Sequence, residues 1–265
     1  MMWYFIFVFV LGACVGSFVN VLIDHTVAGR NWVTGRSVCD HCAKILKWYD
    51  MIPLASYIML GGKSRCCQKT LTPKHLVVEL LFGALFVWWL TIGFAFFHLA
   101  NAPLSYAQPI FWLGVGVILT ILALADLMWG VILMRVLWVG VAWVIGYRVI
   151  LYSYGAYQLS DLWLMMLMGI LSFFFLWFLR FITKGRGMGD GDPYLIFLTS
   201  MLLGYPRAII GVLAAFVGGA VVGMILIISG MRQRSDKIAF GPFIVVGAVI
   251  ALLWGEGLLS SLYGI

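Results

Sequence analysis

Two aspartates stand beside long apolar stretches, Asp126 in the run LADL and Asp192 in the run GMGDGD. Carboxylates beside lipid are costly, and they mark functional sites. Two carboxyl groups a few ångströms apart do not both ionise easily, so they share a proton. One can act as a base toward a bound water while the other polarises a carbonyl. The pair is therefore a candidate for hydrolysing a peptide bond without a metal.

Each aspartate also has a simpler interpretation. Asp126 could be a solvated carboxylate at a helix end, and Asp190 and Asp192 could merely solvate a flexible connector. Glycines 185, 187, 189 and 191 allow positive φ and close approach of another segment, and a carboxylate near a helix start is stabilised by the helix dipole. The glycine-rich run is a weak signal alone and a stronger one with Asp126 on the same side of the membrane.

Four of the five cysteines lie in one polar loop, Cys39 and Cys42 as a C-x-x-C pair and Cys66 and Cys67 as neighbours. A disulfide is disfavoured in the cytoplasm, where the charge pattern places this loop. Four thiolates there indicate a structural zinc site. Adjacent ligands strain the geometry, so His41 is an alternative ligand, and four unliganded thiols are the remaining alternative.

The amino-acid composition is typical of a membrane protein. Of 265 residues 64% are hydrophobic and 10% charged, and the mean hydropathy is +1.07, whereas a soluble domain is about half apolar and a quarter charged. The net charge of +7 falls in loops between apolar stretches, which indicates topology and no nucleic-acid partner. The N-terminal stretch lacks a basic start, and we interpret it as a retained first span.

The apolar stretches predict an all-α polytopic membrane protein of about eight transmembrane helices, each needing about 20 residues. They lie near 2–23, 76–98, 110–127, 136–154, 162–182, 194–204, 208–229 and 240–262. The sixth is short and ends at Gly-Tyr-Pro, a turn signal, so seven spans is the fallback. The only long polar segment is a loop between the first two helices, too small for a robust core without a metal.

The basic residues orient the chain. If loop 24–75 is cytoplasmic and the spans alternate, only Arg148 and Arg207 of the 17 Lys and Arg lie near the other face. Because cytoplasmic loops carry the excess of Lys and Arg, this pattern places the N-terminus outside. It also places Asp126 and Asp192 at the cytoplasmic face.

Six motifs in the same order resemble those of the prepilin peptidases, the type IV leader peptidases with N-methyltransferase activity. They are GSFVNV at 16–21, RSVCDHC at 36–42, WYDMIPLASY at 48–57, VELL at 78–81, GDGD at 189–192 and FGPF at 240–243. Without the resemblance, GPF would indicate only a helix start with Pro242 in its first turn. The resemblance covers almost the whole chain and implies a G-x-G-D aspartic protease.

The resemblance assigns roles to residues. It makes Asp126 and Asp192 the catalytic pair, with Asp190 at the variable position of G-x-G-D, and Cys39, Cys42, Cys66 and Cys67 the zinc ligands. The chain departs from the family pattern at three places. Ile132-Leu133-Met134 replaces I-P-D, Tyr194 replaces a lysine, and Ser64 replaces a cysteine for which Cys66 substitutes.

The reaction that the resemblance implies is cleavage of a prepilin or pseudopilin leader, followed by methylation of the new N-terminus with S-adenosylmethionine. The division would be a first helix at 1–24, a zinc-binding loop domain at 25–75 and a peptidase core at 76–265. The setting would be the bacterial cytoplasmic (inner) membrane, with lipid and the type IV pilus or type II secretion assembly machinery as partners. No methyl-donor pocket is recognisable in the sequence, where Glu79 and Asp50 are the candidates.

Two other classes compete with this prediction. A transporter could use buried carboxylates as a proton or cation relay, which predicts mid-membrane carboxylates and an internal repeat. We see no repeat, and the carboxylates lie near the predicted cytoplasmic boundary. A non-catalytic scaffold around a zinc loop would leave the aspartate pair unexplained.

Overall fold

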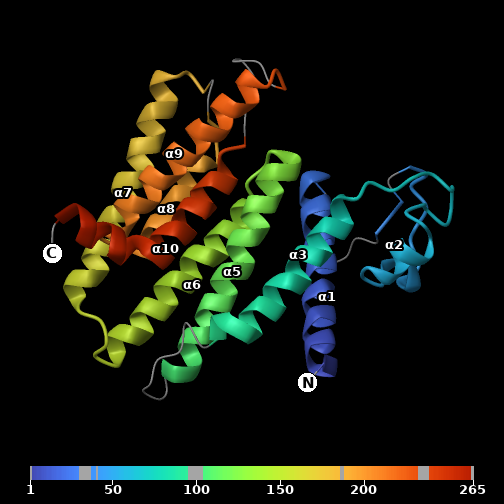
Figure 1. Ribbon diagram of the computed structural model, residues 1–265, viewed down its shortest axis with the longest axis horizontal. Coiled ribbons are helices and arrows are strands. Elements are labelled where there is room, and N and C mark those ends of the chain that lie inside the picture. Colours follow the sequence, from blue (N-terminus) through green and yellow to red (C-terminus); the bar gives the residue numbers. More distant parts are fainter. Residues whose placement is uncertain are drawn as a thin grey trace. The chain divides into compact units, whose positions relative to one another are not determined.

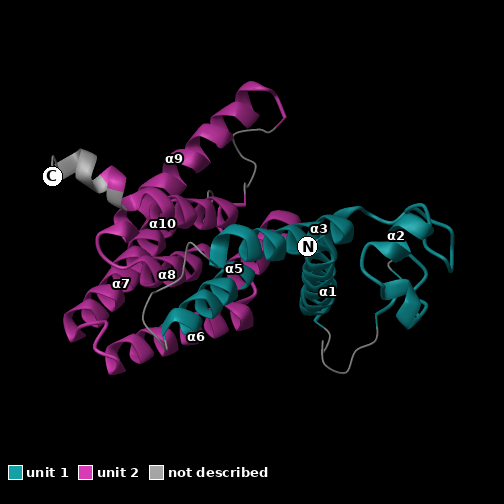
Figure 2. Ribbon diagram, turned by 60° about the horizontal axis from the view of Figure 1, so that its bottom comes forward, with its two compact units in different colours: residues 1–117 teal, residues 118–265 magenta. Residues whose placement is uncertain are grey.

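The computed structural model describes residues 2–29, 37–39, 41–94, 104–185, 188–231 and 239–263, without the side chains of 256 and 259–263. The chain forms two compact units, residues 1–117 and 118–265, and the boundary lies inside one helix (Figure 2). Several residues used above lie outside the described ranges, namely Asp40, Gly187 and the cations Arg30, Arg36, Arg186, Arg232, Arg234 and Lys237.

Helices form nearly all the regular structure of the described residues (Figure 1). Unit 1 contains α1 (Met2–Val27), η1 (Trp48–Met51), α2 (Ala55–Met59), α3 (Lys74–Trp88) and the π-helical turn η2 (Trp89–Gly93). Helix α5 (Leu104–Trp129) crosses into unit 2, which holds α6 (Met134–Ser153), α7 (Leu159–Ile182), α8 (Asp192–Leu203), α9 (Arg207–Ile228) and α10 (Gly241–Tyr263). Extended residues pair only at two isolated bridges in the described part of unit 1.

Among the described residues, six helical stretches are long and apolar enough to cross a membrane, which agrees with the predicted all-helical multi-pass protein. They are Met2–Val27, Lys74–Gly93, Leu104–Trp129, Met134–Ser153, Leu159–Ile182 and Arg207–Ile228. The apolar stretches Asp192–Leu203 and Gly241–Gly255 are helical but shorter. The count of eight spans therefore stays a prediction, as does the division at residues 24 and 75.

Small residues bring α1 and α3 into close backbone contact within unit 1. A Cβ on Gly12 would lie 2.5 Å from the carbonyl oxygen of Phe82, and one on Gly16 would lie 2.8 Å from the Cα of Glu79. Gly12 and Gly16 are four residues apart and therefore share one helix face, the small-xxx-small pattern of membrane helix pairs. This seam fixes the position of Glu79 beside α1.

Helix α8 is the buried centre of unit 2, where it packs against α6, α7, α9 and α10. Nine of its twelve residues are buried. Its length of about 18 Å is well short of the roughly 30 Å hydrocarbon core. Ser200 donates a hydrogen bond to Ser172 of α7 at 2.9 Å, satisfying two buried hydroxyls. A short helix enclosed by longer ones gives Asp192, at its first residue, a rigid support.

The helix boundaries agree with the predicted stretches within a few residues, with one larger difference. Helix α5 begins at Leu104 and contains Pro109, whereas the sequence predicts a start near 110. Proline removes one backbone donor and is best tolerated near a helix start, and here the helix continues on both sides of it. The predicted end of the second span, near 98, lies outside the described residues.

Candidate active site and metal centre

Asp126 lies in the last turn of α5 and is 7% exposed. Its Oδ2 accepts a 2.7 Å hydrogen bond from the backbone N–H of Gly241, the first residue of α10. A helix N-terminus carries partial positive charge and suits an anion. A Cβ on Gly241 would stand 2.6 Å from this oxygen. The glycine of FGPF thus holds the carboxylate, a role that the sequence reasoning missed when it considered only a helix start.

Asp192 begins α8 and is 2% exposed. Its Oδ2 accepts a 2.7 Å hydrogen bond from the N–H of Gly189. Asp190, two residues earlier, has a side chain 85% exposed and forms an ion pair with Arg180. The two aspartates of the GDGD run therefore differ sharply, because only Asp192 keeps its carboxyl group away from bulk water.

The two buried aspartates belong to the same unit, Asp126 in the last turn of α5 and Asp192 at the first residue of α8. The chain that follows α5 passes the glycine run, so that a Cβ on Gly191 would lie 2.6 Å from the Cβ of Ile132. Gly191 has a φ of −89°, which any residue adopts, so of the two uses expected of these glycines it serves close approach. Among the described residues of the connector, positive φ occurs at Lys184 and Gly185.

The four loop cysteines come together in unit 1. Their sulfur atoms all lie within 4.8 Å of one another, with 3.9 Å between Cys39 and Cys67 and 2.9 Å between Cys42 and Cys66. Ligands at about 2.3 Å around a tetrahedral ion would be roughly 3.8 Å apart. The group could therefore hold one metal ion with small adjustments.

The environment of Cys39 also suits a metal ligand, whereas the hydrogen bond with Cys66 raises the pKa of the Cys42 thiol to about 12 when no ion is bound. Burial raises the pKa of the Cys39 thiol, but hydrogen bonds from the Ser64 hydroxyl and the backbone N–H groups of His41 and Cys42 outweigh it and lower that pKa to about 6. Cysteine binds metal as the thiolate rather than as the thiol. The same contacts that stabilise a negative sulfur would stabilise it under an ion.

Residues 37–39 and 41–46, here called the first knuckle, form a tight hairpin that carries both cysteines of the C-x-x-C pair. Cys39 donates its N–H to the carbonyl of Lys44 and accepts from the N–H of Ala43, both at 2.9 Å. Val38 and Ile45 form an antiparallel bridge. Ala43 takes a φ of 55°, the left-handed turn that closes such a hairpin.

Residues 62–71, the second knuckle, repeat this backbone pattern. Ser64 donates to Lys69 and accepts from Gln68, both at 2.8 Å. Lys63 and Thr70 form the bridge, and Gln68 has a φ of 58°. The repeat aligns Ser64 with Cys39, Cys67 with Cys42, and Cys66 with His41.

The second knuckle therefore carries a hydroxyl where the first carries a thiol. Ser64 is 3% exposed, and its Oγ lies 3.2 Å from the sulfur of Cys39 and 3.1 Å from that of Cys66. Cys66 supplies the fourth thiol from an exposed position. His41 instead places Nε2 3.1 Å from the carbonyl oxygen of Thr70, so the structure does not bring this alternative ligand into the cluster.

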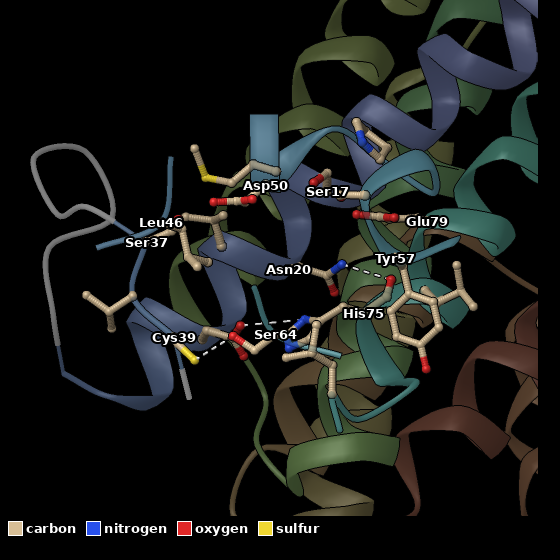
Figure 3. Close-up of a pocket in the computed structure, with 18 of the residues that line it drawn as sticks. Ser17, Asn20, Ser37, Cys39, Leu46, Asp50, Tyr57, Ser64, His75 and Glu79 are labelled. Atoms are coloured by element: carbon tan, nitrogen blue, oxygen red, sulfur yellow. Dashed lines mark hydrogen bonds and ion pairs between the residues drawn. The ribbon is translucent and has the colours of Figure 1, made fainter. Parts of the chain in front are cut away.

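Unit 1 also contains a cavity of about 760 Å³, lined by residues of α1, α3 and the loop between them (Figure 3). Asn20, Asp50 and Glu79 contribute polar side chains to it. Asp50 accepts a 2.8 Å hydrogen bond from Nε of Arg65. Glu79 accepts one at 2.8 Å from the N–H of Leu54, and in the described residues it does not pair with a loop cation. The sequence reasoning missed Asn20, whose environment depends on residues more than fifty positions away.

Both units of the chain are similar to known proteins. Residues 10–92 match the family described as Bacterial Peptidase A24 N-terminal domain. A Prepilin leader peptidase/N-methyltransferase of Pseudomonas aeruginosa is 27% identical over 93% of this chain and 89% of its own length. That of Aeromonas hydrophila is 28% identical over 96% and 92%, and that of Myxococcus xanthus is 30% identical over 86% and 64%.

No solved structure matches the chain. The similarity to the named relatives extends over most of the chain and through both units. The chain is thus similar over most of its length to proteins named Prepilin leader peptidase/N-methyltransferase, and its residues 10–92 match the Bacterial Peptidase A24 N-terminal domain.

Proposed function

We propose that this chain cleaves the leaders of type IV prepilins and pseudopilins with Asp126 and Asp192, and then N-methylates the new N-terminus. One observation carries the proposal. Two aspartates of the same unit are buried, and each accepts a backbone N–H from a glycine. The relatives named Prepilin leader peptidase/N-methyltransferase match both units of the chain.

In the cleavage step the aspartate pair carries one shared proton. The ionised carboxyl group takes a proton from a water, whose oxygen attacks the scissile carbonyl carbon. The protonated carboxyl group gives its proton to the carbonyl oxygen, so that a neutral gem-diol forms. The gem-diol then collapses: the C–N bond breaks, the leaving amine takes the proton that came from the water, and a gem-diol hydroxyl returns its proton to the other carboxyl group. The N–H groups of Gly241 and Gly189 keep one oxygen of each carboxyl group occupied, so the remaining oxygens are oriented for this work.

In the methylation step S-adenosylmethionine is the methyl donor. The lone pair of the deprotonated N-terminal amine attacks the methyl carbon, the N–C bond forms, and the C–S bond breaks. When bound, S-adenosylmethionine would supply the methyl group and would leave as the neutral thioether S-adenosylhomocysteine; the proton that the N-terminal ammonium loses before the transfer goes to water. The name N-methyltransferase of the relatives supports this step.

The four loop cysteines hold a structural zinc ion in this proposal. Zinc prefers four thiolate ligands in tetrahedral sites of this kind, and the sulfur atoms are close enough to surround one ion. The ion would tie the two knuckles together and order a loop with little apolar core of its own. It takes no part in either reaction.

The proposed setting is the bacterial inner membrane with both aspartates at its cytoplasmic face. The support is the placement of Lys and Arg in the sequence, which follows the positive-inside rule. Pilus or type II secretion assembly machinery would receive the processed pilin. The transporter alternative is not favoured, because the curated relatives are named as peptidases.

Mass spectrometry of a prepilin incubated with the purified protein tests both activities together. We expect loss of the leader in all samples and the gain of one methyl group only with S-adenosylmethionine. Asp126→Asn should leave the prepilin uncut while the protein still inserts into membranes. Full cleavage by this variant would disprove the aspartate mechanism.

A further inference from the structure

We infer that the cavity of unit 1 binds S-adenosylmethionine, with Glu79 facing its positive charge and Asn20 Oδ1 accepting one of its N–H groups. The inference rests on the proposed methyltransferase activity and locates it. The cysteine cluster does not provide such a site, because its four sulfur atoms lie within 4.8 Å of one another. The aspartate pair does not either, because it lies in unit 2 and serves the cleavage step in the proposed function.

Asn20 carries the first part of the inference. Its side chain is 5% exposed and lines the cavity. Its Nδ2 donates a 3.0 Å hydrogen bond to the carbonyl oxygen of His75 (Figure 3), which fixes the orientation of the amide because a carbonyl needs a donor. Its Oδ1 is buried and has no partner. A buried acceptor left unpaired is destabilising, so a ligand with an N–H donor would complete this site.

Glu79 carries the second part. It lies on α3, is 9% exposed and lines the same cavity. Its carboxylate accepts a hydrogen bond from the N–H of Leu54, and among the described residues no cation pairs with it. A buried charge is stable only when it is paired. A ligand with net positive charge is therefore the complementary occupant, and S-adenosylmethionine carries a sulfonium as well as an ammonium group.

Backbone strain at Leu54 fixes the Glu79 contact. Leu54 has a φ of 61° and a ψ of −50°, and the N–H of Ala55 bonds back to the carbonyl of Pro53. This is a γ-turn with positive φ, a rare and strained conformation. Such strain persists only where the surroundings enforce it, and it is concentrated at functional sites. Here it points the Leu54 N–H at the Glu79 carboxylate.

The other charged side chains of the cavity already have partners. Asp50 pairs with Arg65 at 2.8 Å, and Asp24 with His75 at 3.7 Å. This leaves Glu79 as the carboxylate available to a ligand. The volume of about 760 Å³ lies within the range of small-molecule and cofactor sites. A compact nucleoside-based cation fits these conditions, whereas a pilin helix is far larger than the cavity.

Equilibrium binding of two ligands to the purified full-length protein tests the role of Glu79. Glu79→Gln keeps an acceptor for Leu54 and removes the charge. We expect S-adenosylmethionine to bind about tenfold more weakly, a loss of about 1.4 kcal/mol. S-adenosylhomocysteine, which lacks the sulfonium, should lose less than about threefold. Asp190→Asn, which removes an exposed charge outside the cavity, should change neither affinity.

Asn20→Leu provides the second test. It removes the unpaired acceptor and should weaken both ligands about tenfold, because both carry the same N–H groups. Both cavity variants should still cleave prepilin, which shows that they are folded. Unchanged S-adenosylmethionine affinity in Glu79→Gln and Asn20→Leu would overturn the site. The site would also be overturned if these variants lost affinity only for a pilin N-terminal peptide. Failure of the unaltered protein to methylate would instead refute the proposed function.

Discussion

The aspartate pair of unit 2 and the cysteine cluster of unit 1 are held in opposite ways. The aspartates are buried and each accepts a backbone N–H, Asp126 from Gly241 of a distant segment and Asp192 from Gly189 three residues earlier. The cysteines lie on two hairpins of the same backbone pattern, where the second hairpin carries a thiol at position 66 and a hydroxyl at position 64. A site fixed by backbone donors requires each residue in its place, whereas a site of side chains around one ion tolerates a relocated ligand.

The largest expected effect is the difference in leader cleavage between a variant of Asp192 and one of Asp190. Asp192→Asn should reduce leader cleavage by about a thousandfold, because the amide cannot share the proton. Asp190→Asn should stay within about twofold, since its carboxyl group is exposed and bound to Arg180. Initial rates on one prepilin, at equal amounts of inserted protein, give both numbers. Equal losses in the two variants would mean that the burial difference has no functional meaning.

The next effect concerns the backbone donor to Asp126. Gly241→Ala places a Cβ 2.6 Å from Oδ2 of Asp126 and should lower cleavage about a hundredfold by moving the carboxylate. Gly218→Ala is the matched control, because its Cβ would meet Phe243 at an ordinary 3.8 Å. Cleavage rates and thermal unfolding of both variants make the comparison. Normal cleavage by Gly241→Ala would show that the carboxylate has room to move.

The relocated cysteine gives a rescue experiment. Cys66→Ser should lower bound zinc below about half an equivalent, because three thiolates hold the ion weakly. Adding Ser64→Cys should restore about one equivalent, since position 64 matches Cys39 in the knuckle repeat. Elemental analysis of the purified variants measures this. A double variant with no more zinc than Cys66→Ser would contradict the equivalence of the two hairpins.

The smallest effect tests the turn that closes each knuckle. Ala43 and Gln68 both have positive φ, a conformation that costs a non-glycine residue about 1 kcal/mol. Gln68→Gly should therefore slow zinc loss to a chelator by a few fold, and Ala43→Gly should do the same. Glycine at Lys44, which follows the turn, should speed it. Faster loss from Gln68→Gly would show that its side chain matters more than its backbone.

The sequence predicts the helices and the chemically active residues well, because apolar runs and residue types are local signals. Residue types and motifs alone single out Asp126, Asp192 and the four cysteines as candidate site residues, and their catalytic and metal-binding roles stay predictions. What it missed depends on distant contacts. The hydrogen bond from Gly241 to Asp126 joins residues 115 positions apart, and no local pattern reveals the alignment of Ser64 with Cys39.

The errors have physical causes as well. Glycine can take positive φ or allow close approach, and the sequence does not distinguish the two uses. At Gly191 the second applies, because Ile132 fills the space that a Cβ would need. Similarly, a histidine inside a C-x-x-C pair resembles a ligand, but the hairpin turns His41 toward Thr70.

The glycine seam between α1 and α3 has a consequence for the polar segment that joins them. Because Gly12 and Gly16 fasten the two helices together, the segment 28–73 is a closed loop whether or not a metal is bound. Joining the ends of a chain of this length costs about 3 kcal/mol of entropy, and helix association supplies it. Zinc then only has to order a loop whose ends are already held, so a chelator should loosen the two knuckles without separating the helices.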